Sequence, residues 1–241
     1  MWDKLFEELN KDFTKGISIR DFIEVDKSLK NFRTISTAMS LPQTEVMDIK
    51  IDDDRILNMI FGEINQTIYK SIFKEISNNT TNTFIDLRNE SNHPGTIDKL
   101  CGSILREDYK YVVTTGRLAV DISDNPVFQT SNLKDVATNG AFVYLTGKLN
   151  NKDIYVDPFM RWNDYKIFLF DKVSLNIENF TAAIVSEATF TPKLVVRFDI
   201  DFLVTPSKTI NVIDSVNSDA LLELKAEHRE QQIDKILKED L

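Results

Sequence analysis

The segment Gly147–Phe170, GKLNNKDIYVDPFMRWNDYKIFLF, is the part of the chain that decides the fold. It combines short apolar runs with a tight turn, the pattern of paired strands built for packing. The segment Thr189–Phe202, TFTPKLVVRFDIDF, has the same character. Neither segment contains a plausible set of catalytic side chains. Both therefore predict a sheet rather than an active site.

Strict alternation in Lys193–Val204 predicts a strand with one packed face and one solvated face. The apolar set is Val196, Phe198, Ile200, Phe202 and Val204, and the polar set is Arg197, Asp199 and Asp201. Further strands are predicted at Tyr109–Thr115, Ala141–Leu145, Ile154–Val156, Tyr165–Phe170 and Val173–Ile177. The stretch after Gly116, RLAVDISDNPVF, fits either a helix or a strand.

A long helix is predicted from Asp52 to Ile76. Asp52–Asp54 provides a cap and favourable negative charge for its start. About 25 residues would span roughly 37 Å. An apolar row at constant i+4 spacing follows, which drifts around the helix axis and suits a helix lying across a sheet. The row is Ile56, Ile60, Ile64, Ile68, Ile72 and Ile76.

The polar stretch Ser77–Asn92 and the turn at His93-Pro94-Gly95 are the best candidate boundary in the chain. After it, Thr96 is expected to cap a short helix that ends at Leu105. The buried side of that helix is predicted to hold Ile97, Leu100, Cys101 and Ile104.

The two ends of the chain differ from this middle part. The first fifteen residues have the spacing of a short helix, and Met1–Met47 as a whole predicts an extended arm that needs a neighbouring subunit. The alternative is that the arm folds back on its own core. Ser218–Leu241 predicts a charged helix that either docks on a neighbour or remains solvated. The apolar residues of the arm are Phe22, Ile23, Phe32, Ile35, Met39 and Leu41.

The composition excludes several classes of protein. With 42% hydrophobic and 28% charged residues, the 241-residue chain is ordinary for a folded protein. A net charge of -9 would repel a polyphosphate on average, which argues against specific nucleic-acid recognition. No apolar run is long enough to span a bilayer. A single cysteine allows no internal disulfide, which suits a reducing site of synthesis.

Catalytic and metal-binding candidates are weak. Cys101 with His93 or His228 would be a nucleophile and base, but a small thiol on the apolar side of a helix is ordinarily structural. Asp199 with Asp201, or the run Asp52–Asp54, offers carboxylates to a hard cation, although sheet-face and helix-start roles are far commoner. We therefore predict no catalytic, cofactor-binding or metal-binding residues, no cofactor, and no enzyme activity.

The order of these elements resembles one protein family. It is GEINQTIYKSI (Gly62–Ile72), YKYVVTTGRL (109–118), GKLNNKDIYVDPF (Gly147–Phe159) and FTPKLVVRFDIDF (Phe190–Phe202). The series is similar to the C-terminal part of the major capsid proteins of T-even-like tailed phages, which have the Hong Kong 97 type shell fold. The similarity covers roughly Asp52–Pro206. The matching residues are Glu63, Ile64, Asn65, Gly147, Tyr155, Val156, Asp157, Phe159, Phe190 and Pro192.

The resemblance implies an α+β fold with an N-terminal arm, a long spine helix, a P-domain sheet and an inserted A-domain. The implied ranges are the arm 1–51, the spine helix and part of the P-domain 52–96, the A-domain 97–184, P-domain strands 185–217 and a C-terminal helix 218–241.

The function implied by the resemblance is a structural capsid protein that assembles into the head shell around a double-stranded DNA phage genome. Its partners would be copies of itself as hexamers or pentamers, other head proteins such as vertex, portal or decoration proteins, and packaged DNA held non-specifically, with no membrane. It would be made in the host cytoplasm and located in the virion. Ion pairs between subunits are expected from Arg161, Asp164, Lys166, Arg197 and Asp199. An encapsulin-like nanocompartment shell, and a soluble hydrolase with an acidic pair, remain the alternatives.

Overall fold

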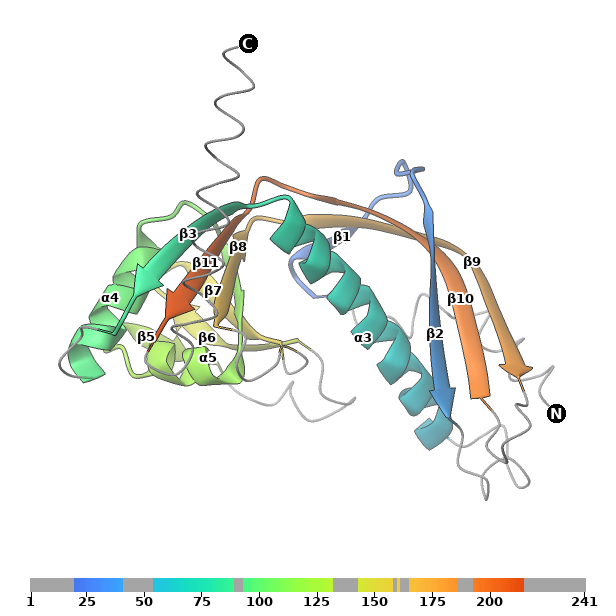
Figure 1. Cartoon of the computed structure of the whole chain (residues 1–241), viewed down its shortest axis with the longest axis horizontal. Coiled ribbons are helices and arrows are strands. Elements are labelled where there is room, and N and C mark those ends of the chain that lie inside the picture. Colours follow the sequence, from blue (N-terminus) through green and yellow to red (C-terminus); the bar gives the residue numbers. More distant parts are fainter. Residues whose placement is uncertain are drawn as a thin grey trace, which may run out of the picture. The chain divides into compact units, whose positions relative to one another are not determined.

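The structure is a computed structural model, and it describes residues 20–40, 54–88, 93–131, 143–157, 160, 165–185 and 193–214 (Figure 1). The chain divides into two compact units, each described here by itself. Unit 1 comprises Met1–Glu75, Leu133–Tyr144 and Asp171–Thr205. Unit 2 comprises Ile76–Asn132, Leu145–Phe170 and Pro206–Leu241. The two predicted terminal helices lie outside the described residues.

A four-stranded sheet in the order β1-β9-β10-β2 organises unit 1. The short β1 is parallel to β9, and β10 is antiparallel to both β9 and β2. The pairing of β9 with β10 shifts register between Arg197 and Asp199, and Asn179 in β9 has φ 55° there. The bounds are β1 Ile23–Val25, β2 Arg33–Ser40, β9 Val173–Val185 and β10 Lys193–Val204.

The predicted long helix is confirmed as α3, Asp54–Asn78, which lies beside this sheet in Figure 1. The part of its isoleucine row with described side chains is fully buried, so the i+4 pattern did identify the packed face. Tyr69 of α3 meets Phe22 edge to face, with ring centroids 6.3 Å apart. The buried row is Ile60, Ile64, Ile68, Ile72 and Ile76.

Over residues 20–40, the predicted arm packs on its own chain. Phe22 is fully buried, and all eight residues of β2 pair with β10 of the same chain. The reason is that Phe22, Ile23 and Met39 find apolar contacts within unit 1. The alternative, an arm that folds back on its own core, therefore holds over this range.

The predicted alternation along β10 is correct as far as Ile200 and wrong beyond it. Val196, Phe198 and Ile200 are buried, while Arg197 is exposed. At the end of the strand, Asp201 is buried and Phe202 only half-buried. Asp201 accepts a hydrogen bond from the backbone N–H of Asn31 at 2.7 Å, and this contact replaces water on the face expected to be solvated.

Unit 2 contains a seven-stranded sheet in the order β3-β11-β8-β4-β7-β6-β5. Two pairs are parallel, β3 with β11 and β4 with β7. The strands are β3 Thr81–Asp86, β4 Tyr111–Thr114, β5 Phe128–Thr130, β6 Tyr144–Leu149, β7 Lys152–Val156, β8 Lys166–Phe170 and β11 Lys208–Ile213.

Strand β3 lies within the polar stretch that was predicted to be a boundary. Its sequence, TNTFID, carries few apolar side chains. Its parallel pairing with β11, more than 120 residues away, makes it a strand, so the local sequence did not indicate it.

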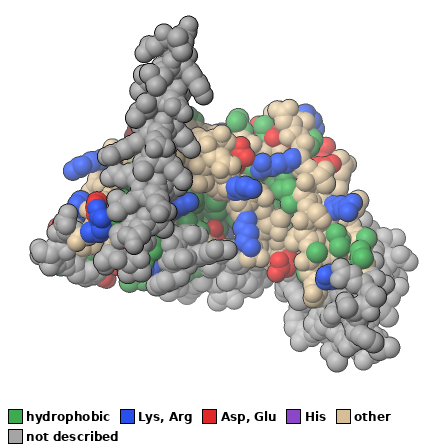
Figure 2. All heavy atoms as spheres, in the orientation of Figure 1, with side chains coloured by type: hydrophobic (Ala, Val, Ile, Leu, Met, Phe, Trp, Pro, Cys, Tyr) green, Lys and Arg blue, Asp and Glu red, His purple; other side chains and the backbone are tan. Residues whose placement is uncertain are grey.

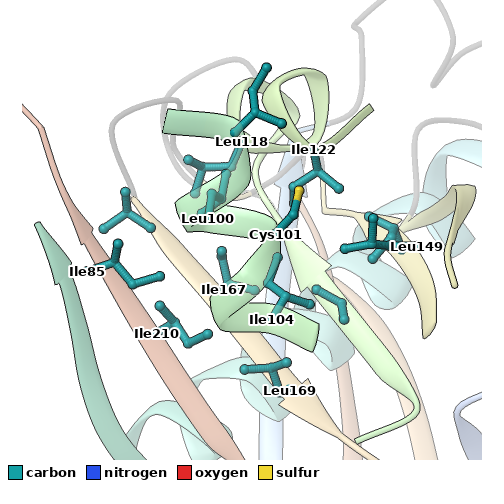
Figure 3. Packing of buried hydrophobic residues seen from close by; sticks show 14 of the residues in the cluster. Ile85, Leu100, Cys101, Ile104, Leu118, Ile122, Leu149, Ile167, Leu169 and Ile210 are labelled. Atoms are coloured by element: carbon teal, nitrogen blue, oxygen red, sulfur yellow. The ribbon is translucent and has the colours of Figure 1, made fainter. Parts of the chain in front are cut away.

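Two helices belong to the apolar core of unit 2. The predicted short helix is confirmed as α4, His93–Leu105, but it starts earlier than expected, so Thr96 lies within it and does not cap it. The ambiguous stretch after Gly116 begins as a helix, α5, Gly116–Ser123. Thr115 caps α5 by accepting a hydrogen bond from the N–H of Leu118. Figure 3 shows Leu100, Ile104, Leu118 and Ile122 of these helices packed against Ile167, Leu169 and Ile210 of the sheet.

Strand β6 was predicted at Ala141–Leu145, but its described part runs from Tyr144 to Leu149, so Gly147 lies within a strand. A Cβ atom at Gly147 would overlap the backbone oxygen of Gln129 and the ring of Phe128 in β5. Only glycine allows β5 to lie this close to β6.

Replacing this glycine is expected to destabilise unit 2. Gly147→Ala forces β5 away from β6, and overpacking of this kind costs about 1–3 kcal/mol. Chemical denaturation of both the wild type and the variant measures the change. Gly102→Ala in α4 is the matched control, because nothing beyond its chain neighbours and its own helix backbone lies within 4 Å of its Cβ position. Alanine is favoured there by about 0.5–1 kcal/mol. Equal effects of the two substitutions would contradict the close contact at Gly147.

Candidate functional site

Cys101, the candidate nucleophile, lies in the apolar core of unit 2. Its side chain is 1% exposed, and Figure 3 shows its sulfur turned toward Ile122. Burial raises the pKa of the Cys101 thiol to about 11, so the thiol stays protonated at neutral pH. The side chain of His93 and all of His228 lie outside the described residues. The structure therefore supports a packing role for Cys101.

The candidate carboxylates of β10, Asp199 and Asp201, accept hydrogen bonds from other segments of the same chain. Asp199 accepts hydrogen bonds from Thr34 Oγ1 at 2.6 Å and from Asn179 Nδ2 at 2.9 Å. Its partners lie in the same chain, which differs from the predicted ion pair between subunits; Arg161 and Asp164 lie outside the described residues. Across the described ranges, no group of three His, Cys, Asp or Glu side chains is arranged to bind a metal.

The segment 26–32, called here the crossing segment, runs over one face of the four-stranded sheet. It must cross because β1 lies at one edge of the sheet and β2 at the other. It passes over four polar side chains on the face opposite Phe198, called here the polar row. These are Asn176 and Glu178 of β9 and Asp199 and Asp201 of β10.

Polar contacts attach the crossing segment to this row. Lys30 Nζ lies 2.8 Å from Glu178 Oε1, and Asn176 Nδ2 donates to the carbonyl of Leu29 at 3.0 Å. Asp201 accepts from the N–H of Asn31. At its start, Asp26 accepts from both the N–H and the hydroxyl of Ser28, which hold the pKa of the Asp26 carboxyl below its usual value. The polar row thus provides the hydrogen bonds that the crossing segment would otherwise make with water.

Acid is expected to loosen this segment. Lys30 and Asn176 hold the pKa of Glu178 below its ordinary value, and Thr34 and Asn179 do the same for Asp199. A carboxylate with a lowered folded-state pKa contributes stability above its unfolded-state pKa, and this stability is lost as the pH falls through the folded value. Hydrogen exchange at pH 7 and below about pH 4, corrected for intrinsic rates, should show peptides from 26–32 opening more than those from 60–76.

Glu178→Gln tests the origin of that loss. Glutamine keeps the shape of the side chain but cannot pair with the Lys30 ammonium, so the segment should already exchange faster at neutral pH and change less on acidification. An unchanged pH response in this variant would contradict the assignment to Glu178.

Three carboxyl groups behave as structural carboxylates and not as the acid of a hydrolase's acid–base pair. An acid–base pair needs one carboxyl with a raised pKa. The carboxyl groups of Asp26, Glu178 and Asp199 have lowered pKa values instead. Hydrogen bonds to the charged form cause each shift, which is the behaviour of structural carboxylates.

In unit 2, Arg117 of α5 contacts the residue before β8, Tyr165, and the residue after β11, Asp214. Its guanidinium donates to the hydroxyl of Tyr165, lies 4.8 Å from that ring's centroid, and pairs with Asp214 Oδ2 at 3.0 Å. Burial raises the pKa of the Tyr165 hydroxyl, which therefore stays protonated. These contacts fix the end of β11 against α5 and offer no reactive group.

None of the helices in the described ranges is long and apolar enough to cross a membrane. On the face in view in Figure 2, Lys and Arg side chains are interspersed with Asp and Glu side chains. This distribution agrees with the net charge of -9 and gives no basis for a nucleic-acid groove on that face.

The open backbone edges of the four-stranded sheet are the remaining candidate site. Strand β1 pairs only with Val173–Leu175 of β9, and β2 ends the sheet on the other side. No described strand pairs with the rest of the outer edge of β9 or with the outer edge of β2. Such edges present backbone groups that can pair with another chain. Sequence reasoning missed them because the pairing that defines an edge is non-local.

Comparison with known proteins identifies the fold. No protein-family model matches the sequence, and no curated protein matches it. Among solved structures, the chain is similar to the virus-like particle from Pyrococcus furiosus, with a TM-score of 0.51 and 10% identity over 87% of this chain and 98% of that chain.

Two further likenesses have TM-scores too low to bear on the fold. The procapsid of satellite phage P4 with its size determination (Sid) protein gives 0.44 at 9% identity, covering 81% of each chain. Mycobacterium phage Che8 gives 0.44 at 10% identity, covering 74% of this chain and 70% of that chain. At 10% identity, the likeness to the virus-like particle protein bears on the fold alone. The fold predicted from the sequence is confirmed: the chain has the α+β fold of Hong Kong 97 type capsid proteins.

Proposed function

We propose that this protein is a structural shell subunit, whose function is to assemble with copies of itself into a closed head around a double-stranded DNA phage genome. The single observation that carries the proposal is the shared fold with the virus-like particle protein, which extends over nearly all of that chain. The described chemistry agrees with it, because the cysteine is buried and the carboxylates of β10 hold the chain together. On this proposal, the protein is not an enzyme.

Several finer assignments belong to the same proposal. The domain ranges 1–51, 52–96, 97–184, 185–217 and 218–241 remain predictions, although Val173–Val185 pairs with β10 in the four-stranded sheet. Membership of the T-even-like branch, contacts with vertex, portal or decoration proteins, synthesis in the host cytoplasm and location in the virion are predictions too. An acidic chain would surround DNA without gripping it.

Electron microscopy of the purified protein tests the proposal. Closed particles of uniform size are expected under at least one assembly condition. Monomers under every condition, together with no shells in cells that make the protein, would overturn it. The content of the particles separates the two kinds of container: nucleic acid supports a phage head, whereas a packaged enzyme supports the nanocompartment alternative.

A further inference from the structure

Among the described strands, β2 forms an open edge of the four-stranded sheet. Its eight residues, Arg33–Ser40, pair with β10 on one side in unbroken register, and no described strand lies on the other. It contains no proline and no lysine, two residues that proteins use to guard edges against other chains. Its one charge, Arg33, pairs with Glu75 at 3.0 Å and lies 4.2 Å from the ring centroid of Phe202.

The opposite edge of the same sheet is guarded over part of its length, from Val173 to Asn179. Strand β1 covers the first three residues of β9, and the register shift near Asn179 interrupts the strand beyond them. Glu178 adds a charged side chain to that part of the strand. Bulges and charges are devices that prevent edge-to-edge pairing. The two edges therefore differ: among the described strands, β2 is open and regular over its whole length, whereas β9 is covered at its start and interrupted near Asn179.

We infer that β2 pairs with β2 of a second copy, antiparallel about a two-fold axis at Thr37. The inference rests on the proposed function, since it names one contact between subunits of the shell. With the axis perpendicular to the sheet, the buried faces of both copies stay on one side, and two four-stranded sheets join into one of eight. Such a contact is isologous, the commonest form of self-association.

The side chains of β2 are self-complementary in this register. Ile35 opposes Met39, which gives an apolar pair on the inner face, and Thr37 opposes its own copy. Ser36 opposes Ala38, and Thr34 opposes Ser40, on the exposed face. No like charges face each other, and cross-strand apolar and threonine pairs are the pairs that stabilise sheets.

An engineered cysteine tests the register directly. Opposed residues of antiparallel strands have Cα atoms about 4.5–5.5 Å apart, within the range of a disulfide. Thr37→Cys is therefore expected to form a disulfide-linked dimer under mild oxidation of assembled protein. The chain's one natural cysteine, Cys101, is buried and does not compete.

Ser36→Cys is the matched control. Its two copies lie two residues apart along the strands, so their Cα atoms are about 8 Å apart, too far for a disulfide. Thr37→Cys should give at least about tenfold more linked dimer, and equal yields from the two variants overturn the inference. Adding Ser36→Lys to Thr37→Cys should remove most of the linked dimer, because a lysine guards the edge.

The wild type provides a second measurement that needs no substitution. Amides of Arg33–Ser40 should exchange more slowly in the assembled protein than in the unassembled protein, and equal rates overturn the inference. The outcomes also separate the two proposals. Particles without a Thr37→Cys dimer leave the shell function standing and refute the β2 contact. A Thr37→Cys dimer without particles supports the contact and refutes the shell.

Discussion

Phe198→Ala is expected to lower the free energy of unfolding by about 3–5 kcal/mol, the usual loss for a fully buried phenylalanine. Phe198 has no exposed surface, and it lies in β10 between β9 and β2. Its ring belongs to the buried face of the four-stranded sheet, the face that also carries Val196 and Ile200. Alanine would leave a cavity that the neighbouring strands cannot fill without breaking their pairing.

Chemical denaturation of the unassembled protein measures this loss, and peptide-resolved hydrogen exchange assigns it to unit 1. Arg197→Ala is the control, since Arg197 directly precedes Phe198 in the strand and is exposed on the other face. A surface substitution of this kind changes stability by no more than about 0.5 kcal/mol. A similar loss from both variants would mean that β10 is not packed on one face.

Patterns local in the sequence predicted the elements that pack on one face. The isoleucine row of α3 was identified because helix periodicity alone brings residues four apart onto one side. The alternation of β10 predicted its buried face through Ile200, because successive residues of a strand point to opposite faces of the sheet. The burial of Asp201 could not be predicted from this alternation, because its hydrogen-bond partner, the backbone N–H of Asn31, lies 170 residues away.

Elements that depend on distant partners could not be predicted. Strand β3 is polar and becomes a strand by pairing with β11, and β1 pairs only three residues with β9. The contacts of the crossing segment and the open sheet edges also depend on parts of the chain that are distant in sequence. Lys30 meets Glu178 across 148 residues, and the open edge of β2 is defined by where the sheet ends. The sequence therefore indicated a shell fold through a resemblance in order, but not the surfaces of the sheet.

Ile104→Ala is the second large effect expected, a loss of about 2–5 kcal/mol in unit 2. Ile104 is fully buried on α4, and Figure 3 shows it near Ile167 and Leu169, which belong to β8. Deleting three of its carbon atoms removes contacts with both layers at once. The loss of stability exceeds the free energy of transferring these atoms to water, because the close-packed neighbours fill the resulting cavity only in part.

Denaturation of the unassembled protein, with exchange of peptides from 93–123, measures this loss and assigns it to unit 2. Asp98→Ala is the matched control because Asp98 is exposed on the same helix. Its effect should stay within about 0.5 kcal/mol, since alanine favours a helix and no buried contact is lost. If the two variants were equally stable, α4 would not be part of the core, and the assignment of Cys101 to a packing role would fail with it.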